Sequence, residues 1–555
     1  MPRSALAAKR RSRILALSLA LSLLPITACQ ARPPQQEAEG PDTPTIGCPP
    51  GPPVAGIEHD PTAILKYGSV PASSLDPIRQ VEANEITVLQ TIFDPLVKLN
   101  ENDEPVPGLA TEWKMVSDDT MEFKLRPGVV FQDGTPFNAE AVKFNIERAK
   151  NDPESNIKAE LANVTAVEVV DEHTVHFKLD PPNPAALPII LSDRAGLMAS
   201  PTAVQAAGSS EAFSASPVGA GPYKVEGPWF ARERVSVRAW DGYWNAAERK
   251  LAGIDFIETA TDASLGAVQA GDLDIQYIDD GKVDAACADS RLRVFSTPTN
   301  EVRALIINQS IPPFDNLKVR QALYYALDRQ AIADALTGGK AEMATGWFPK
   351  NSIAYSPELA EAYEYNPEKA KQLLAEAGYP NGVSFTAEIG GSFTAYVQMG
   401  ELVQAQLKEA GFDMDLQLID PAQMLSRLYG SATTPPTVAA SPLAFPPARQ
   451  PSSRFKDRFL AEGRYNPSKV EIPGMRELIA KADAATDPAE RARYFQEAAK
   501  LAWEEAAAGV PLYFVTGHTV FASYVGGVKR GSTRSNMIFD GLYITKGRVP
   551  VDGRS

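Results

Sequence analysis

The alternation of apolar and polar residues predicts β-strands in the first half of the chain. Residues 63–67 form a short apolar run, AILKY, and residues 122–128 and 167–179 alternate as EFKLRPG and VEVVDEHTVHFKL. Successive side chains of a strand point to opposite faces, so each alternating stretch is expected to bury one face. The region from about 101 to 218 is therefore expected to be rich in β-structure.

Helical patterns dominate after residue 311. Residues 317–336 are predicted to form one helix, opened by Asp315-Asn316 and closed by Gly338-Gly339. In YNPEKAKQLLAEAG, Asn366 is expected to cap a helix that ends at Gly378. An earlier helix is expected after Asn138, which is also a good cap.

A strand–helix–strand order is predicted between residues 384 and 419. SFTAEI and FDMDLQLI read as strands, and a helix is expected between them at about 395–410. This order usually makes the two strands parallel neighbours. The chain is thus expected to contain at least two α/β cores, with two lobes and a ligand-binding cleft between them.

The N-terminus has the pattern of an export signal. Basic residues precede the almost wholly apolar stretch 14–26, which is too short to be a good transmembrane span. Ile26-Thr27-Ala28-Cys29 resembles the bacterial lipobox, which implies that Cys29 becomes a lipid-carrying N-terminus. The alternative is a signal peptide cut elsewhere, with Cys29 incidental.

The segment that follows Cys29 is rich in Pro, Gly, Gln and Glu and nearly lacks large apolar residues. Such a composition cannot bury enough surface to offset the entropy of ordering, so residues 29–56 are expected to be a flexible tether. A lipid anchor and a tether would hold a soluble body outside the cell, at the outer face of the cytoplasmic membrane.

Size, charge and cysteine content narrow the class further. The roughly 500 residues beyond the tether exceed what one core usually holds, so two or three domains are expected. The net charge of −15 makes the chain a poor nucleic-acid binder. Cys48 and Cys287 remain after lipidation. Outside the cytoplasm the two cysteines can either form a disulfide or remain separate thiols, and the sequence does not decide between these alternatives.

A search for catalytic chemistry finds no motif. The sequence lacks G-x-S-x-G, H-E-x-x-H, C-x-x-C and a Walker A loop. Of the four histidines, His173 and His176 stand three apart on a predicted strand, where their side chains point to opposite faces and cannot share a metal. We therefore expect no catalytic residue, no metal and no cofactor, and predict that the protein is not an enzyme.

Five sequence blocks, in this order, resemble one family, the extracellular solute-binding proteins of family 5 that serve ABC importers of peptides, nickel and related solutes. The resemblance spans the body from about 62 to 530. The blocks are GLATEWKMVSDDTMEFKLRPGVVFQDGTPFNAEAVKFNIERA at 108–149, PVGAGPYKVEGPWFARERVSVRAWDGYWNA at 217–246, AVQAGDLDI at 267–275, IINQSIPPFDNLKVRQALYYALDRQAI at 306–332 and YNPEKAKQLLAEAGYPNG at 365–382.

The resemblance implies an α/β, type II periplasmic-binding-protein fold with two lobes, an inserted subdomain and a cleft between the lobes. It also implies two chain crossings, near residues 308–312 and 509–511, that form a hinge. The expected division is 1–28 signal peptide, 29–56 tether, 57–97 with 219–310 and 510–555 as domain I, 98–218 as the inserted domain II, and 311–509 as domain III.

The expected ligand site departs from that of peptide-binding relatives. Those proteins often hold the peptide ammonium with an aspartate in a domain III segment whose counterpart here, residues 433–455, has neither aspartate nor tryptophan. Either the amine is held elsewhere or the ligand is not an ordinary free-amine peptide, because a buried ammonium without a carboxylate is costly. The candidate ligand contacts are Gly68, Ser69, Val70, Trp347, Phe348, Ser441, Phe445 and Arg449.

Two of these candidates have structural alternatives. Arg449 is either a bidentate partner for an anionic group or a surface arginine in a loop. Trp347 and Phe348 lie between Gly346 and Pro349, which favours a cleft rim, and the alternative is plain core.

These features predict a monomeric, lipid-anchored capture subunit that delivers a peptide or peptide-like solute to an ABC permease. A second reading is a non-transport receptor or sensor of the same fold. An extracytoplasmic hydrolase is a third reading, and a nickel binder is disfavoured by the few histidines and cysteines.

Overall fold

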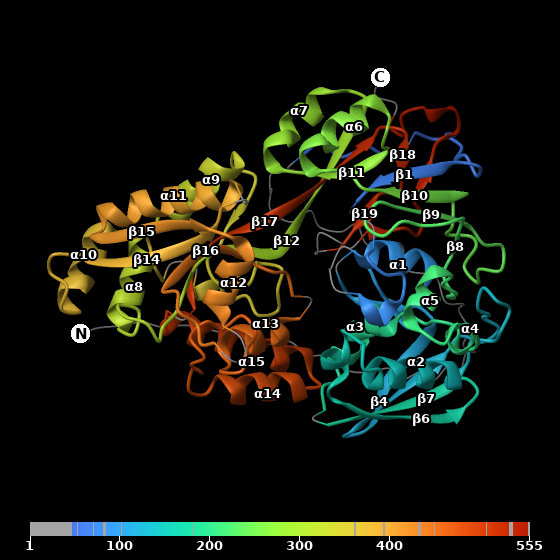
Figure 1. Ribbon diagram of the computed structural model, residues 1–555, viewed down its shortest axis with the longest axis horizontal. Helices are drawn as coiled ribbons and strands as arrows, with labels where there is room; N and C mark the ends of the chain where they lie inside the picture. The colour runs from blue at the N-terminus through green and yellow to red at the C-terminus, as the bar shows by residue number, and fades with distance from the viewer. Residues whose placement is uncertain are drawn as a thin grey trace, which may run out of the picture. The chain divides into compact units, whose positions relative to one another are not determined.

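The computed structural model (Figure 1) describes most of residues 47–552. The residues inside this range that it does not describe are 53, 70–71, 81–84, 102, 181, 360–361, 392–393, 431–433, 449, 507 and 532–536. The predicted signal peptide, Cys29 and most of the tether lie outside the described residues. Within the described part, no helix combines the length and apolar character needed to cross a membrane.

The largest sheet of the described residues combines segments from distant parts of the chain. A short strand, β13 (Glu342–Met343), pairs with β17 beside the main order. In sheet order, the strands are β15 (Phe412–Ile419), β14 (Val383–Gly390), β16 (Ala440–Phe445), β12 (Leu292–Ile307), β17 (Gly509–Ala522), β11 (Ile275–Ile278), β1 (Ile64–Gly68), β10 (Gly253–Ile257), β9 (Arg234–Ala239) and β8 (Tyr223–Val225).

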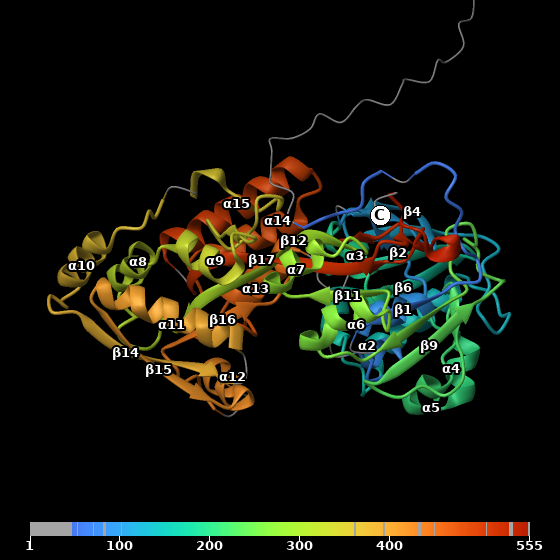
Figure 2. The ribbon, with the colours of Figure 1, turned by 90° about the horizontal axis from the view of Figure 1, so that it is seen from above.

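The antiparallel strands β12 and β17 connect two hydrophobic cores, and Figures 1 and 2 show them side by side. Val294 and Val520 belong to one core, whereas residues 302–307 and 510–515 mostly belong to another. The strand register shifts between Pro298 and Val302, where the chain passes from one core to the other. The crossings expected at 308–312 and 509–511 therefore lie elsewhere, because both strands continue well into the second core.

The predicted β-rich region forms a separate antiparallel sheet with a helix beside it. Asn138 caps α2 (Ala139–Asn151), as predicted, by accepting a hydrogen bond from the Ala141 amide at 3.1 Å. The apolar faces of sheet and helix share one core. In sheet order, the strands are β4 (Ala110–Ser117), β5 (Thr120–Leu125), β7 (Thr174–Leu179) and β6 (Val164–Asp171).

The single helix predicted at 317–336 is wrong in one respect, because the structure divides it. α8 (Leu317–Ala326) ends where Leu327 becomes extended, and α9 (Arg329–Thr337) begins after Asp328. The Asp328 carboxylate accepts from the Ala331 amide at 2.9 Å. Aspartate competes with the helical backbone in a helix interior and stabilises a helix start, so the break falls at this residue.

The strand–helix–strand prediction is confirmed. β14 and β15 are parallel neighbours in register from Val383 opposite Phe412 to Gly390 opposite Ile419, and α11 (Thr394–Glu409) connects them. Asn366 caps α10 (Pro367–Glu376) as expected. The other helices are α1 (Ile86–Ile92), α3 (Ala186–Ile190), α4 (Pro201–Ala207), α5 (Ser210–Ala215), α6 (Ser264–Ala270), α7 (Val283–Ala288), α12 (Pro421–Tyr429), α13 (Pro451–Phe459), α14 (Met475–Ala484) and α15 (Pro488–Glu504).

The structure places Cys48 and Cys287 in a disulfide, with their Cα atoms 5.6 Å apart. Cys48 also exchanges backbone hydrogen bonds with Val294 of β12. Arg293, next to this bridge, forms a buried ion pair at 2.7 Å with Asp552 near the C-terminus. The first described residues and the last ones are thus fastened to the same part of the sheet.

Candidate ligand-binding cleft

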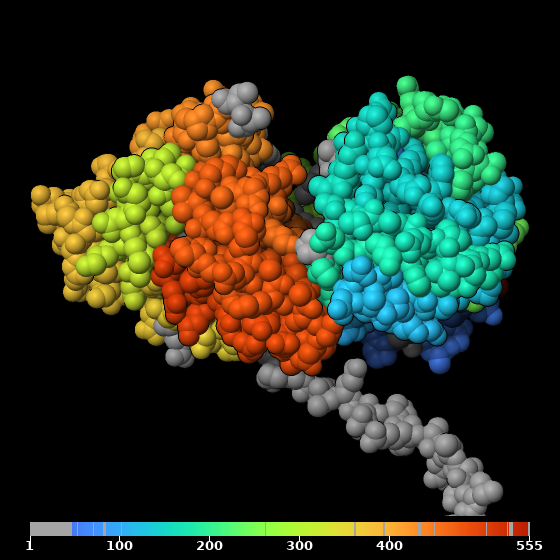
Figure 3. All heavy atoms as spheres, turned by 90° about the horizontal axis from the view of Figure 1, so that it is seen from below, coloured from blue at the N-terminus to red at the C-terminus, as the bar shows by residue number. Residues whose placement is uncertain are grey.

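Two cavities lie between α13 with its neighbours and the inserted β-rich lobe. Their volumes are about 750 and 730 Å³. They share the wall residues Ile189, Ala448, Gln450 and Arg454, so they are adjacent. Figure 3 shows the surfaces of the two lobes facing each other across this groove.

A hydrogen bond joins the two walls of the cleft. The Gln450 side-chain amide donates a hydrogen bond to the Ala186 carbonyl oxygen at 3.0 Å. Gln450 precedes α13 and Ala186 begins α3, and the two residues are 264 positions apart in the sequence. One hydrogen bond of this kind contributes about 1 kcal/mol, which is small enough for a ligand to replace.

The α13 wall is built on two buried arginines one helical turn apart. Arg454 and Arg458 are each only 1% exposed. Arg454 donates to the carbonyl oxygens of Trp347 at 2.6 Å, of Pro446 at 3.3 Å and of Asn300. These bonds pin the 300 and 446 segments, which line the cavities, to the helix.

The aromatic residues of this wall stack on the same arginines. The Phe445 ring centre lies 5.4 Å from the Arg454 guanidinium and 4.9 Å from that of Arg458. Phe348 lies 5.5 Å from Arg454 on another side. Cation–π attraction to these rings offsets part of the cost of burying the two charges.

The opposite wall of the 750 Å³ cavity carries polar and charged side chains beside a few apolar ones. Gln80, Asn156, Glu160, Asp193 and Arg194 line it. The Arg194 Nε atom donates to Glu160 at 2.6 Å. Burial is the largest single influence on the pKa of Arg194 and lowers it. The Glu160 carboxylate and other nearby acidic groups together outweigh burial, so the pKa is raised overall.

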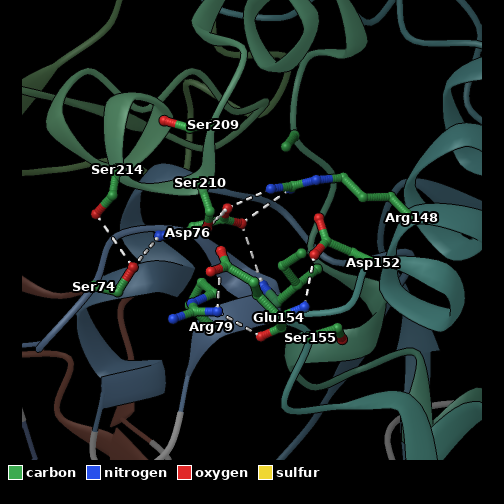
Figure 4. Close-up of polar contacts among 12 residues, drawn as sticks. Ser74, Asp76, Arg79, Arg148, Asp152, Glu154, Ser155, Ser209, Ser210 and Ser214 are labelled. Carbon is green, nitrogen blue, oxygen red and sulfur yellow. Dashed lines mark hydrogen bonds and ion pairs between the residues drawn. The ribbon is translucent and has the colours of Figure 1, made fainter.

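A buried network supports this wall from behind (Figure 4). Asp76, which is 0% exposed, accepts hydrogen bonds from the Arg148 guanidinium and the Ser210 hydroxyl. The Asp76 carboxylate also caps the short 3-10 helix of residues 77–79. Asn156 is held there by its side-chain bond to the Arg79 carbonyl oxygen at 2.8 Å, so the network fixes a residue of the cavity wall.

The 730 Å³ cavity offers acceptors for hydrogen bonds. Thr297, Pro298 and Asn300 of β12 line it where the strand passes between the cores. Among the described residues, Thr297 Oγ1 and Asn300 Oδ1 are buried without a hydrogen-bond partner. Because both oxygens are buried within the wall, the N–H or O–H groups of a ligand would reach them only after a shift of this segment.

Gly68 and Ser69, two of the contacts predicted after the first strand, line neither cavity. Gly68 ends β1, and a Cβ there would lie 2.6 Å from Leu273 Cδ1, so glycine allows this close packing. Ser69 donates its amide to the Ile257 carbonyl oxygen at 3.0 Å. Its hydroxyl oxygen is buried without a partner among the described residues. Val70 lies outside the described residues.

The predicted contacts from the helical lobe separate into wall and core. Phe348 lines the 730 Å³ cavity and Phe445 the 750 Å³ cavity. Trp347 lines neither, because it packs edge-on against Phe445 and Phe459, with ring centres 6.3 and 6.0 Å away. Trp347 therefore lies in the core, which was the alternative to the cleft rim expected from the sequence.

Ser441 also lies in the core and Arg449 is not described. β16, which carries Ser441, runs between β14 and β12, and Ser441 is 0% exposed with its hydroxyl 3.7 Å from Met424 Sδ. At this position of the central strand the side chain is buried, so Ser441 presents no exposed group to either cavity. Arg449 lies outside the described residues, although Ala448 and Gln450 on either side line the cleft.

Sequence reasoning missed the residues that carry most of the wall chemistry, namely Asn300, Gln450 and Arg454. One signal was present in PSSRFKDRF. Arg454 and Arg458 share a helical face with Phe455 and Phe459, and cations on an apolar face indicate buried arginines. The groups of histidine, cysteine and carboxylate side chains in the described residues include no candidate metal site.

A family model and known relatives match most of this chain. Residues 104–441 match the family model of bacterial extracellular solute-binding proteins, family 5 Middle. The glutathione-binding protein GsiB of Salmonella typhi is 32% identical over 455 residues, which cover 78% of this chain and 85% of that protein. These relatives are solute-binding proteins, which confirms the expectation that the chain is not an enzyme.

Solved structures confirm the predicted fold class, the type II periplasmic-binding-protein fold. The ABC transporter substrate-binding protein CtaP of Listeria monocytogenes superposes with a TM-score of 0.78 at 23% identity, covering 87% of this chain and 100% of that one. MoaA from A. tumefaciens R10, solved with mannopinic acid, has a TM-score of 0.71 at 25% identity, covering 87% of this chain and 100% of that one.

Proposed function

Because this chain belongs to family 5 of the bacterial extracellular solute-binding proteins, which work with an ABC permease outside the cytoplasm, we propose that it captures a peptide or peptide-like solute in the cleft between α13 and the inserted lobe. Cys29 anchors it to the membrane by lipid, and the ligand is delivered to the permease by the closed form.

One observation carries this proposal. Two adjoining cavities of about 750 and 730 Å³ share a wall, and both lobes line them. Small-ligand sites have volumes of about 300–1,000 Å³ and prefer interfaces between domains. Unpartnered acceptors at Thr297 and Asn300 suit the N–H groups of a peptide, and the relative that binds glutathione, a tripeptide, supports the same class.

Closure of the cleft is the proposed signal to the permease. The register shift of β12 near Pro298–Val302 supplies a bending point, because it breaks the regular pairing with β17. A ligand that touches both walls binds the closed state more tightly than the open one and so shifts the population towards closure.

Native mass spectrometry of the mature protein, followed by thermal melts with an oligopeptide library, tests the capture role. A co-purified peptide-like solute or a ligand-dependent rise in Tm supports it. The absence of both across the library contradicts it. Fractionation of a Cys29→Ser variant tests the anchor, since this variant is expected to leave the membrane fraction.

The second reading, a receptor that feeds a sensor, differs in its need for a permease. Deletion of the gene should abolish growth on the captured solute as sole nitrogen source if the protein serves import. Unchanged growth, together with intact ligand binding, would favour the sensor.

A further inference from the structure

The α13 wall of the cleft carries the buried positive charges of Arg454 and Arg458. Ion pairs between described residues include neither Arg454 nor Arg458, and both guanidinium groups donate to backbone carbonyl oxygens instead. The carboxylate that most influences Arg454 is that of Glu301, which is itself paired with Arg303 at 3.1 Å.

Burial makes this charge costly. Desolvation, with repulsion from Arg458, lowers the pKa of Arg454 to about 9, and desolvation lowers the pKa of Arg458 to about 10. Both groups still carry a charge at neutral pH. A cation buried without an anion raises the free energy of the folded protein, and an anion bound beside it lowers that free energy again.

A third arginine stands at the mouth of the same cavity. Arg464 lines the 750 Å³ cavity, is exposed, and has its guanidinium 5.2 Å from the Tyr465 ring centre. It too forms no ion pair with another described residue. Arg464 is therefore accessible to a ligand, while Arg454 contributes its charge from just beneath the wall.

The carboxylates around this cavity limit the kind of anion. Asp457 lies on the same helix, and burial raises its pKa while Arg464 opposes that rise. Glu160, paired with Arg194, and Asp193 face it from the other wall. A polyanion such as phosphate would be repelled by these groups. A solute that carries a carboxylate beside neutral or cationic groups can contact both the arginines and the acidic side chains.

We propose that the 750 Å³ cavity binds the carboxylate end of the captured solute, with Arg464 in contact and Arg454 beneath it. This inference rests on the proposed capture function and specifies the orientation of the ligand. The hydrogen-bonding groups of the solute then extend past Gln450 towards Asn300 and Thr297 in the second cavity.

Isothermal titration of the mature protein with two matched probe pairs tests this. The pairs are trialanine with trialanine amide, and glutathione with its glycine monoethyl ester, so each pair differs in one C-terminal carboxylate. The free acids should bind at least about tenfold more tightly than the blocked forms. Arg464→Gln should weaken binding of the acids about three- to fivefold, since the group is exposed, and leave the blocked forms unchanged.

Arg493→Gln is the matched control, because Arg493 is an exposed arginine of α15 that pairs with Glu490 and Glu497 and lines neither cavity. It should change neither affinity. Arg454→Met should reduce the preference for acids over blocked forms further than Arg464→Gln does, and Arg454→Lys should restore part of it. If Arg454→Met fails to fold, the Arg464→Gln result decides.

Equal affinity for acids and blocked forms, or equal weakening of both by Arg464→Gln, overturns the inference and leaves the capture function standing. If none of the four probes binds while the library yields another solute, the carboxylate assignment fails and the capture function stands. If the library is silent as well, both proposals fail.

Discussion

Replacement of Asp76 by asparagine tests whether the network behind the cavity wall stabilises the inserted lobe. Asp76 is 0% exposed, and the Arg148 side chain that pairs with it is 10% exposed. Asparagine keeps the shape and one acceptor but removes the charge. The guanidinium of Arg148 is then buried without a counter-ion, a situation that costs about 3–5 kcal/mol.

We expect the lower end, about 3 kcal/mol, because the amide oxygen of asparagine still accepts one hydrogen bond. Urea denaturation followed by circular dichroism measures the loss directly. Glu154→Gln is the control, since the pair of Glu154 with Arg79 in the same region is exposed (62% and 35%) and contributes less than about 1 kcal/mol.

A double-mutant cycle separates the charge from the packing. Adding Arg148→Met to Asp76→Asn removes the uncompensated cation, so the double variant should be more stable than the sum of the two single losses predicts. The reasoning is refuted if Asp76→Asn costs no more than Glu154→Gln, or if the two losses simply add.

Three further predictions concern stability. Gly509→Ala should destabilise the protein by several kcal/mol in urea denaturation, because Gly509 has φ +116° and a Cβ would lie 2.0 Å from the Leu305 carbonyl oxygen; a loss no larger than that of Gly266→Ala, where space is open, would contradict this. Cys48→Ser with Cys287→Ser should cost up to about 5 kcal/mol, because the bridge closes a loop across 239 positions, and an unchanged urea midpoint would speak against it. Hydrogen bonds from Arg476 lower the pKa of Glu462 to about 2, so this exposed pair should add a small stability above pH 4.5 that is lost as pH falls towards 2. In urea midpoints measured against pH, Glu462→Gln should reduce the fall in stability between pH 4.5 and 2. An unchanged fall in the variant would reject the assignment.

The sequence by itself determined the local structure and the family. Helix caps at Asn138 and Asn366 and the parallel pair β14–β15 were predicted correctly, because they depend on residues close together in the chain. The break at Asp328 was local too, yet the apolar periodicity of 317–336 concealed it. The ordered blocks led to the family and hence to the fold class.

Only the tertiary structure decided which of the candidate residues meet the cleft. Trp347 and Phe348 are neighbours in the sequence, yet the first packs into the core and the second lines a cavity. The buried charge of Arg454 depends on carbonyl oxygens of residues 300, 347 and 446. Such walls arise where segments hundreds of residues apart pack together, and no short-range pattern in a single sequence records that meeting.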